Sequence, residues 1–300
     1  MEQRIDPRTS LMRWNVSLAL LLVSAGCASP HDIGWPGAAP TENLTAQEQR
    51  EMLVEGEKDW AHRDDRSSLI HAMEKFSKVA AANPGNYEVQ ELLCRGYYLL
   101  ADSHTDDMDE KKKFWELSIA WGQRAMATNP DFRRRVVDGH EPMENALDAL
   151  KKSQVDAVYW TAASVGKWTF HSGTADRLAN RNKITKLIQR VEQLDPDYFY
   201  GAVNRYWGMY YAVAPFIAGG SMQKSLEHFR RAFKAANNYF GSHVLFAETY
   251  AARKADKALF RRELEFVLKG RPESLPDIVP EQMLEQKKAK HMLETIDNYF

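Results

Sequence analysis

Apolar residues recur at steps of three and four along most of the chain, a spacing typical of amphipathic helices, whereas strand-like alternation is scarce. The last such run places Ala289, Leu293, Ile296 and Phe300 on one face. The pattern predicts an all-α protein of about twelve helices. Helices are expected over 45–61, 67–82 and 86–101, one ending at 128, a short one from 142, then 153–171, 174–195 and 197–213, one each from 221 and 242, one ending at 270, and one from 280.

Several helix ends carry capping signals. Thr45-x-x-Glu48 reads as a capping box, and Ser153-x-x-Asp156 is expected to open another helix. Asn83-Pro84, Asn129-Pro130 and Asp195-Pro196 are expected to end helices, because proline disfavours helical backbone in the residue before it.

Four junctions between these helices share one design, in which small apolar residues lead into an Asn/Asp-Pro or Asn-Asn turn followed by an aromatic residue. The aromatic residues are Tyr87, Phe132, Tyr198 and Tyr239. The turns at 84, 130, 196 and 238 are 46, 66 and 42 residues apart, and a regular tetratricopeptide repeat has about 34 residues. The sequence therefore predicts degenerate tetratricopeptide repeats, whose helix pairs stack into a superhelix with a concave face.

Aromatic residues are unusually dense in the predicted helices 153–171 and 197–213. Two adjoining stripes on the second helix cover more of it than one packing face needs, so we predict that some rings line the concavity with polar help from Lys167 and Asn204. A filled core is the alternative. The candidate ligand- or pore-lining residues are Trp160, Lys167, Trp168, Tyr200, Asn204, Tyr206, Trp207, Tyr210 and Tyr211. The next segment, "APFIAGG" at 214–220, either rims the opening or is a simple turn.

The N-terminus contains an uncharged run from Trp14 to Gly26 that ends at Cys27. It is shorter than the roughly 20 apolar residues that span a bilayer and suits the apolar region of a secretory signal. "SAGC" resembles the bacterial lipoprotein box, although Ser24 stands where leucine is usual. We therefore expect a signal peptide over 1–26, a lipidated Cys27 that begins a tether over 27–44, and one helical domain over 45–300. A plain secreted protein is the alternative, and translation from Met12 would give a more normal signal.

Three segments of the C-terminal half carry a more specific resemblance: "DAVYWTAASVGKW", "LDPDYFYGAVNRYWGMYYAVAPFIAGGSMQKSLEHFRRAF" and "VLFAETYAARKADKALFRRELEFVL". In this order they resemble the TatT family, the tetratricopeptide-repeat lipoproteins associated with TRAP transporters. The resemblance implies an α-helical superhelix with a central pore or groove, and a periplasmic lipoprotein that partners a TRAP solute-binding protein. In bacterial lipoproteins Asp after the cysteine favours the inner membrane, so Ala28 implies the periplasmic face of the outer membrane.

Composition and motifs argue against other classes of protein. A net charge near −1 does not suit a partner bound through phosphate contacts, so we expect no nucleic-acid partner. The nine histidines lack metal-ligand spacing, and no nucleotide-binding or hydrolase motif is present. We therefore expect no catalytic residues, no metal and no cofactor. Cys94 is expected to be a buried apolar residue in a helix.

The sequence thus predicts a membrane-anchored periplasmic binding or adaptor protein of a TRAP transporter, not an enzyme. It would dock the solute-binding protein and hold or relay a small, partly apolar organic acid, or a lipid-like ligand, in an aromatic-lined pore. Self-association into a homo-oligomer is left open. The alternative is a tetratricopeptide scaffold lipoprotein that serves envelope protein assembly, and an enzyme with an unrecognised site is a third interpretation.

Overall fold

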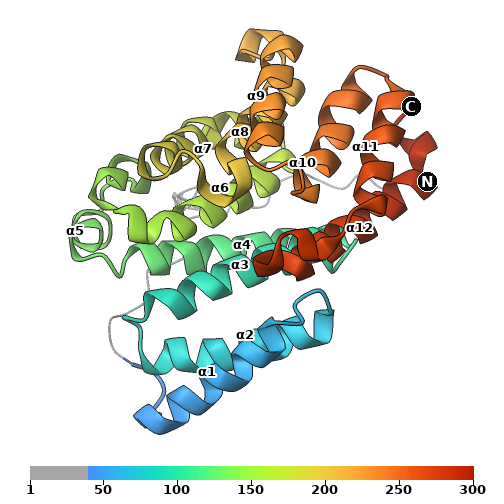
Figure 1. Cartoon of the computed structure of the whole chain (residues 1–300). Helices are drawn as coiled ribbons and strands as arrows, with labels where there is room; N and C mark the ends of the chain where they lie inside the picture. Colours follow the sequence, from blue (N-terminus) through green and yellow to red (C-terminus); the bar gives the residue numbers. More distant parts are fainter. Residues whose placement is uncertain (1–39) are drawn as a thin grey trace, which may run out of the picture.

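The computed structural model describes residues 40–300, and within that range the protein is all-α, without strands (Figure 1). The predicted fold class is confirmed. The helices are α1 (Ala46–Trp60), α2 (Arg66–Ala82), α3 (Tyr87–Ser103), α4 (Met108–Met126), α5 (Pro130–Arg133), α6 (Val155–Phe170), α7 (Thr174–Leu194), α8 (Tyr198–Val213), α9 (Met222–Ala235), α10 (Phe240–Leu245), α11 (Lys257–Lys269) and α12 (Val279–Glu294). The expected signal peptide, Cys27 and most of the expected tether lie outside the described residues.

Polar caps explain why many helices begin where the sequence placed them. Thr45 accepts from Glu48 N and Glu48 accepts from Thr45 N, so the predicted capping box is formed. The side chains of Asn86, Ser221 and Asp256 accept from backbone N–H groups in the first turns of α3, α9 and α11. These caps satisfy donors that have no partner inside the helix.

The segment between α4 and α6 departs from the prediction. The helix expected from 142 is two 3-10 turns, Met143–Asn145 and Leu147–Ala149, preceded by α5 and a π-turn over Arg134–Asp138. Ser153 is not a cap, because α6 is preceded by a further 3-10 turn over Lys152–Gln154. The hydroxyl of Tyr87, distant in sequence, accepts from Ala157 N instead. A tertiary contact therefore replaces the local cap.

Successive helices pack as pairs, α1 with α2, α3 with α4, α6 with α7, α8 with α9 and α11 with α12. The two ends of the array also meet. Near the end of α1, Arg63 binds Glu281 of α12, and Lys287 of α12 donates to Asp64 O. Leu284 of α12 belongs to the same apolar cluster as Leu69 of α2. In Figure 1, α12 runs beside α3 although the two helices are far apart in sequence. The superhelix is therefore closed across its interior by its last helix.

The apolar residues that the pattern placed on helix faces fill several separate clusters between these pairs. Cys94 is fully buried, and burial raises the pKa of its thiol to about 12, which confirms its reading as an apolar residue. None of the helices in the described part of the chain is both long and apolar enough to cross a membrane.

Candidate functional site

Helix α3 turns a stripe of polar side chains toward the interior of the superhelix. Glu91, Arg95, Tyr98 and Asp102 follow one another at steps of four, three and four, so they lie on one helical face. Matching stripes occupy two further helices, and the three stripes together are called the inner face. Its members on α6 and α12 are Asp156, Trp160, Lys167, Glu281, Glu285 and Lys288.

Ion pairs join the three stripes. At one level Arg95 Nη2 of α3 lies 2.6 Å from Glu281 Oε1 of α12. About two turns further on, Asp102 of α3 binds Lys167 Nζ of α6 at 2.7 Å and also binds Lys288 of α12. Residues near the N-terminal end of one stripe thus pair with residues near the N-terminal end of another, and residues near the C-terminal ends pair likewise. The three helices consequently run in the same direction around a shared interior.

This environment shifts the pKa values of the inner face in opposite directions. Burial raises the pKa of Glu91 to about 8, and Arg95 only partly opposes the shift. Burial would also raise the pKa of Asp102, but Lys167 and Lys288 hold it well below its usual range. Burial likewise opposes the charge of Lys288, yet Asp102 and Glu285 raise its pKa. The ion pairs therefore keep charges inside the molecule that burial alone would remove.

Solvent reaches part of the inner face. Burial opposes the charge of Lys167, but Asp102 raises the pKa of its ammonium group. The Lys167 side chain is 32 % exposed, and that of Lys288, which binds the same carboxylate, is 24 % exposed. Both lysine side chains are therefore partly open to solvent.

At the Arg95 level of the inner face, aromatic rings surround two arginines, and we call the set the arginine–aromatic cluster. Arg95 Cζ lies 5.2 Å from the ring centroids of both Trp160 and Phe199, within cation–π range. Arg205 Cζ lies 4.2 Å from the Tyr239 centroid and 6.0 Å from that of Phe199. The ring of Phe199 is thus shared by two guanidinium groups. The cluster consists of Arg95, Trp160, Phe199, Arg205 and Tyr239.

An unusual backbone turn positions Phe199. Phe199, Tyr200 and Gly201 have φ values of 41°, 57° and 77°, in the left-handed region that side chains disfavour. Arg205 holds this turn, because its Nη1 donates to Tyr200 O at 2.6 Å and its Nη2 donates to Phe199 O at 3.0 Å. Strain of this kind often marks a functional site.

A cavity of about 600 Å³ adjoins the cluster and is lined by Asp197, Phe199, Tyr200 and Ala235. Its volume is within the range usual for small-molecule sites. Phe199 borders both the cavity and Arg95, and Tyr200 stacks on Tyr239 with 5.5 Å between ring centroids. The cavity and the arginine–aromatic cluster therefore share a wall.

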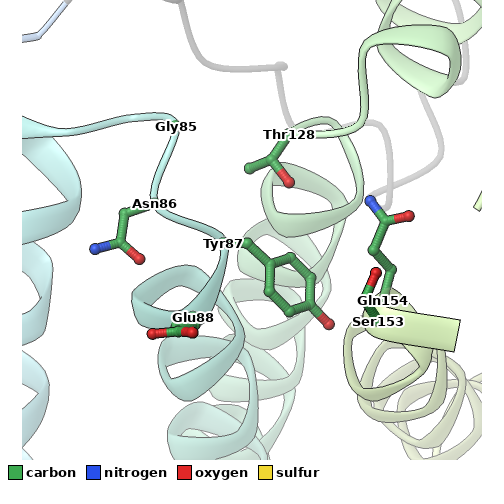
Figure 2. A pocket seen from close by; sticks show the side chains of 7 residues that line it. All are labelled: Gly85, Asn86, Tyr87, Glu88, Thr128, Ser153 and Gln154. Atoms are coloured by element: carbon green, nitrogen blue, oxygen red, sulfur yellow. The ribbon is translucent and has the colours of Figure 1, made fainter. Parts of the chain in front are cut away.

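A second cavity, of about 430 Å³, lies where the turns before α3 and α6 meet the end of α4 (Figure 2). Figure 2 shows the ring of Tyr87 reaching from α3 toward Ser153 and Gln154. The Gln154 amide oxygen accepts from Asn129 Nδ2 and Lys151 N. These groups cap and connect helix ends, so we assign this cavity a structural role.

A family model described as "TRAP transporter T-component" matches residues 101–300, two thirds of the chain. The chain belongs to the TRAP transporter T-component family. Membership associates the chain with a TRAP transporter, as the resemblance implied. Members of the family are transporter components, and the family is not a known enzyme family. Glu91 and Arg95 precede the matched residues.

The T-component chain is also similar to an uncharacterized protein of Treponema pallidum (strain Nichols). The two are 26% identical over 179 residues, which cover 57% of this chain and 54% of that protein. The chain thus spans about half the length of the curated relative it matches.

The structure brings some of the sequence-predicted residues of the T-component chain together. Trp160 lies in the arginine–aromatic cluster, Lys167 on the inner face, and Tyr200 against the larger cavity. Trp168 is nearly buried beside Trp115, and its Nε1 donates to Glu116 Oε1 at 3.0 Å.

The remaining candidates lie on other faces of α8. Asn204 Oδ1 is 3.1 Å from His228 Nδ1 of α9, and Tyr211 stacks on the same histidine. Tyr206, Trp207 and Tyr210 contact one another's rings, and the Tyr210 hydroxyl donates to Ala218 O. These residues contact α9 and the loop 214–220, whereas Phe199 and Arg205 are the α8 side chains in the arginine–aromatic cluster.

Most polar residues of the inner face were missing from the sequence-based set. Glu91, Arg95 and Asp102 lie on a helix whose apolar stripe is equally regular, and the sequence analysis assigned them no role. The available signal was a second regular stripe, of polar residues, on a helix with buried neighbours on the opposite face. Among residues 40–300 no cluster of His, Cys, Asp and Glu is arranged to hold a metal ion.

Proposed function

We propose that this T-component is a periplasmic adaptor of a TRAP transporter, which docks the solute-binding protein and holds or relays a small, partly apolar organic acid. The observation that supports ligand binding most directly is the 600 Å³ cavity, because its wall at Phe199 also contacts arginines that are surrounded by aromatic rings. Such a site offers apolar area for a ligand body and a few fixed polar contacts.

Membrane attachment through lipidated Cys27, on the periplasmic face of the outer membrane, is part of the proposal. It rests on the sequence alone. Mass spectrometry of the protein from its native host would test it, because lipidation adds diacylglycerol mass to an N-terminal peptide that begins at Cys27. A mature peptide beginning elsewhere and lacking acyl mass would contradict it.

Docking is supported by an exposed apolar pair at the tip of the loop 214–220. Phe216 and Ile217 are 91 % and 96 % exposed, and the loop is held by Arg181 and the Tyr210 hydroxyl, which both donate to Ala218 O. Rigidly presented apolar side chains are typical of protein interaction sites.

A photo-crosslinking amino acid at Ile217 would test docking in the native host, with Val54 on α1 as the control position. We expect Ile217 to capture a TRAP solute-binding protein and Val54 not to do so. If crosslinking at Ile217, together with pull-down after general chemical crosslinking, captures no solute-binding protein, the adaptor proposal fails. Capture of outer-membrane assembly proteins instead would favour the scaffold alternative.

A further inference from the structure

One buried arginine of the arginine–aromatic cluster has no acidic partner. Arg205 is 4 % exposed, yet its partners are the carbonyls of Phe199 and Tyr200 and the Tyr159 hydroxyl. It makes no ion pair with an acidic residue of the described chain. A buried cation without a counter-ion is costly, which favours an anion bound nearby.

The neighbouring acids do not supply the missing partner. Arg63 and Arg95 share the single carboxylate of Glu281, at 2.6 Å each. Asp156 accepts from the Tyr198 hydroxyl at 2.6 Å, and Asp197 lines the larger cavity. Burial raises the pKa of Glu91 to about 8, so this carboxyl is mostly neutral near pH 7. None of these acids pairs with Arg205, and two guanidinium groups compete for Glu281.

Polar atoms without partners mark where an anion would contact the protein. Trp160 Nε1, Arg95 Nε and Glu91 Oε1 are buried and have no hydrogen-bond partner among the described residues. Trp160 is only 4 % exposed, and the Arg95 guanidinium lies over its ring. Two of these atoms are N–H donors, the groups that a carboxylate accepts from. A buried polar atom usually finds a partner, so their grouping indicates a binding position.

We propose that Arg95 and Trp160 bind the head group of a monocarboxylate, whose apolar body extends along Phe199 into the cavity lined by Tyr200 and Ala235. Arg205, on the other side of Phe199, adds a positive charge without contacting the ligand. A dicarboxylate would bring its second negative charge into the cavity beside Asp197, and an uncharged amphiphile would leave Arg205 without an anion nearby. This inference rests on the proposed function and specifies the ligand class for the same site.

Calorimetric titration of the purified chain would test the proposal with three probes of similar length: octanoate, 1-octanol and the dicarboxylate suberate. We expect octanoate to bind at least about tenfold more tightly than the other two. Arg95→Gln should weaken octanoate binding about tenfold or more and leave octanol binding unchanged, since Glu281 keeps its pair with Arg63. The matched control is Arg177→Gln, because Arg177 also lies over an aromatic ring, that of Phe170, but on the outer surface.

Trp160→Phe provides a second variant should Arg95→Gln fail to fold. It keeps an aromatic ring, removes the Nε1 donor and should weaken octanoate binding severalfold. Equal binding of octanoate and octanol, no binding of any probe, or unchanged octanoate affinity in both variants would overturn the inference. Crosslinking at Ile217 reports separately on the adaptor role, so persistence of that crosslink would show that only the ligand assignment had failed.

Discussion

Arg63 and Glu281, 218 residues apart, form a buried two-pronged ion pair that joins the end of the first helix to the start of the last. Arg63 Nε and Nη2 lie 2.8 and 2.6 Å from the two carboxylate oxygens, and Arg95 binds the same carboxylate from α3. One acidic side chain thus holds α12 against both the segment that follows α1 and the inner face of α3.

Replacing Glu281 with Gln should destabilise the protein strongly. It would leave Arg63 and Arg95 buried without a charged partner, and breaking a buried ion pair from one side typically costs about 3–5 kcal/mol. Urea unfolding would measure the loss. The control is Glu265→Gln, because Glu265 pairs with Lys269 on the surface at 3.6 Å and such pairs contribute under about 1 kcal/mol. Equal losses in the two variants would argue against a closing role for Glu281.

Glu91 should make the stability of the protein depend on pH near neutrality. Burial raises its pKa to about 8 in the folded protein, Arg95 opposes the shift and Asp156 adds to it. The unfolded chain releases this proton near pH 4.3, a typical glutamate value. Between these values the folded state binds the extra proton, so the contribution of Glu91 to stability falls as the pH rises, by at most about 1.4 kcal/mol per unit.

Glu91→Gln keeps the shape of the neutral side chain and removes the titration. Its unfolding free energy relative to the wild type should therefore increase from about pH 5 to about pH 8 and then level off. Urea unfolding at a series of pH values checks this. Glu88→Gln, an exposed change on the same helix, should follow the wild type over this range. A constant difference between Glu91→Gln and the wild type would contradict a raised pKa for Glu91.

Gly201 should tolerate no side chain, for two separable reasons. Its φ of 77° disfavours alanine, at a cost of about 1–2 kcal/mol. An added Cβ would also lie 3.1 Å from Ala235 Cβ and 3.3 Å from Ala232 Cα. Gly219 has a φ of 90° but open space around an added Cβ. Gly201→Ala should therefore lower thermal stability more than Gly219→Ala does, and equal losses would exclude the packing contribution.

Trp207→Ala should lower stability and leave ligand binding intact. The aromatic stripe on α8 predicted a ligand role for Trp207, but its ring contacts Tyr206, Tyr210 and Tyr211. Because it is half-buried, we expect a loss of about 2–4 kcal/mol, near the low end for truncating a large aromatic side chain. Thermal melting and octanoate titration together check this. A normal melting temperature with tenfold weaker octanoate binding would contradict this expectation and indicate that Trp207 belongs to the ligand site.

The helices were predictable because their signals are local. The capping box of Thr45 and Glu48, the Asn83-Pro84 turn and the cap at Ser221 each act within a few residues. The prediction was wrong at Ser153 and from residue 142, where the Tyr87 hydroxyl reaches the start of α6 from a distant turn. A local pattern carries no information about such a partner.

The sequence by itself determined the all-α class, most helix boundaries and the paired arrangement, since hydrophobic period, caps and turn residues act over a few residues. It also indicated Trp160, Lys167 and Tyr200. Only the tertiary structure decided which helix faces meet. The aromatic stripes of α8 and the polar stripe of α3 have equally regular spacing. However, Arg95 of α3 lies on the inner face, whereas Trp207 of α8 lies away from the arginine–aromatic cluster. The physical reason is that the interior position of a side chain depends on how α12 closes against α3, through contacts such as Arg63 with Glu281 that join opposite ends of the chain.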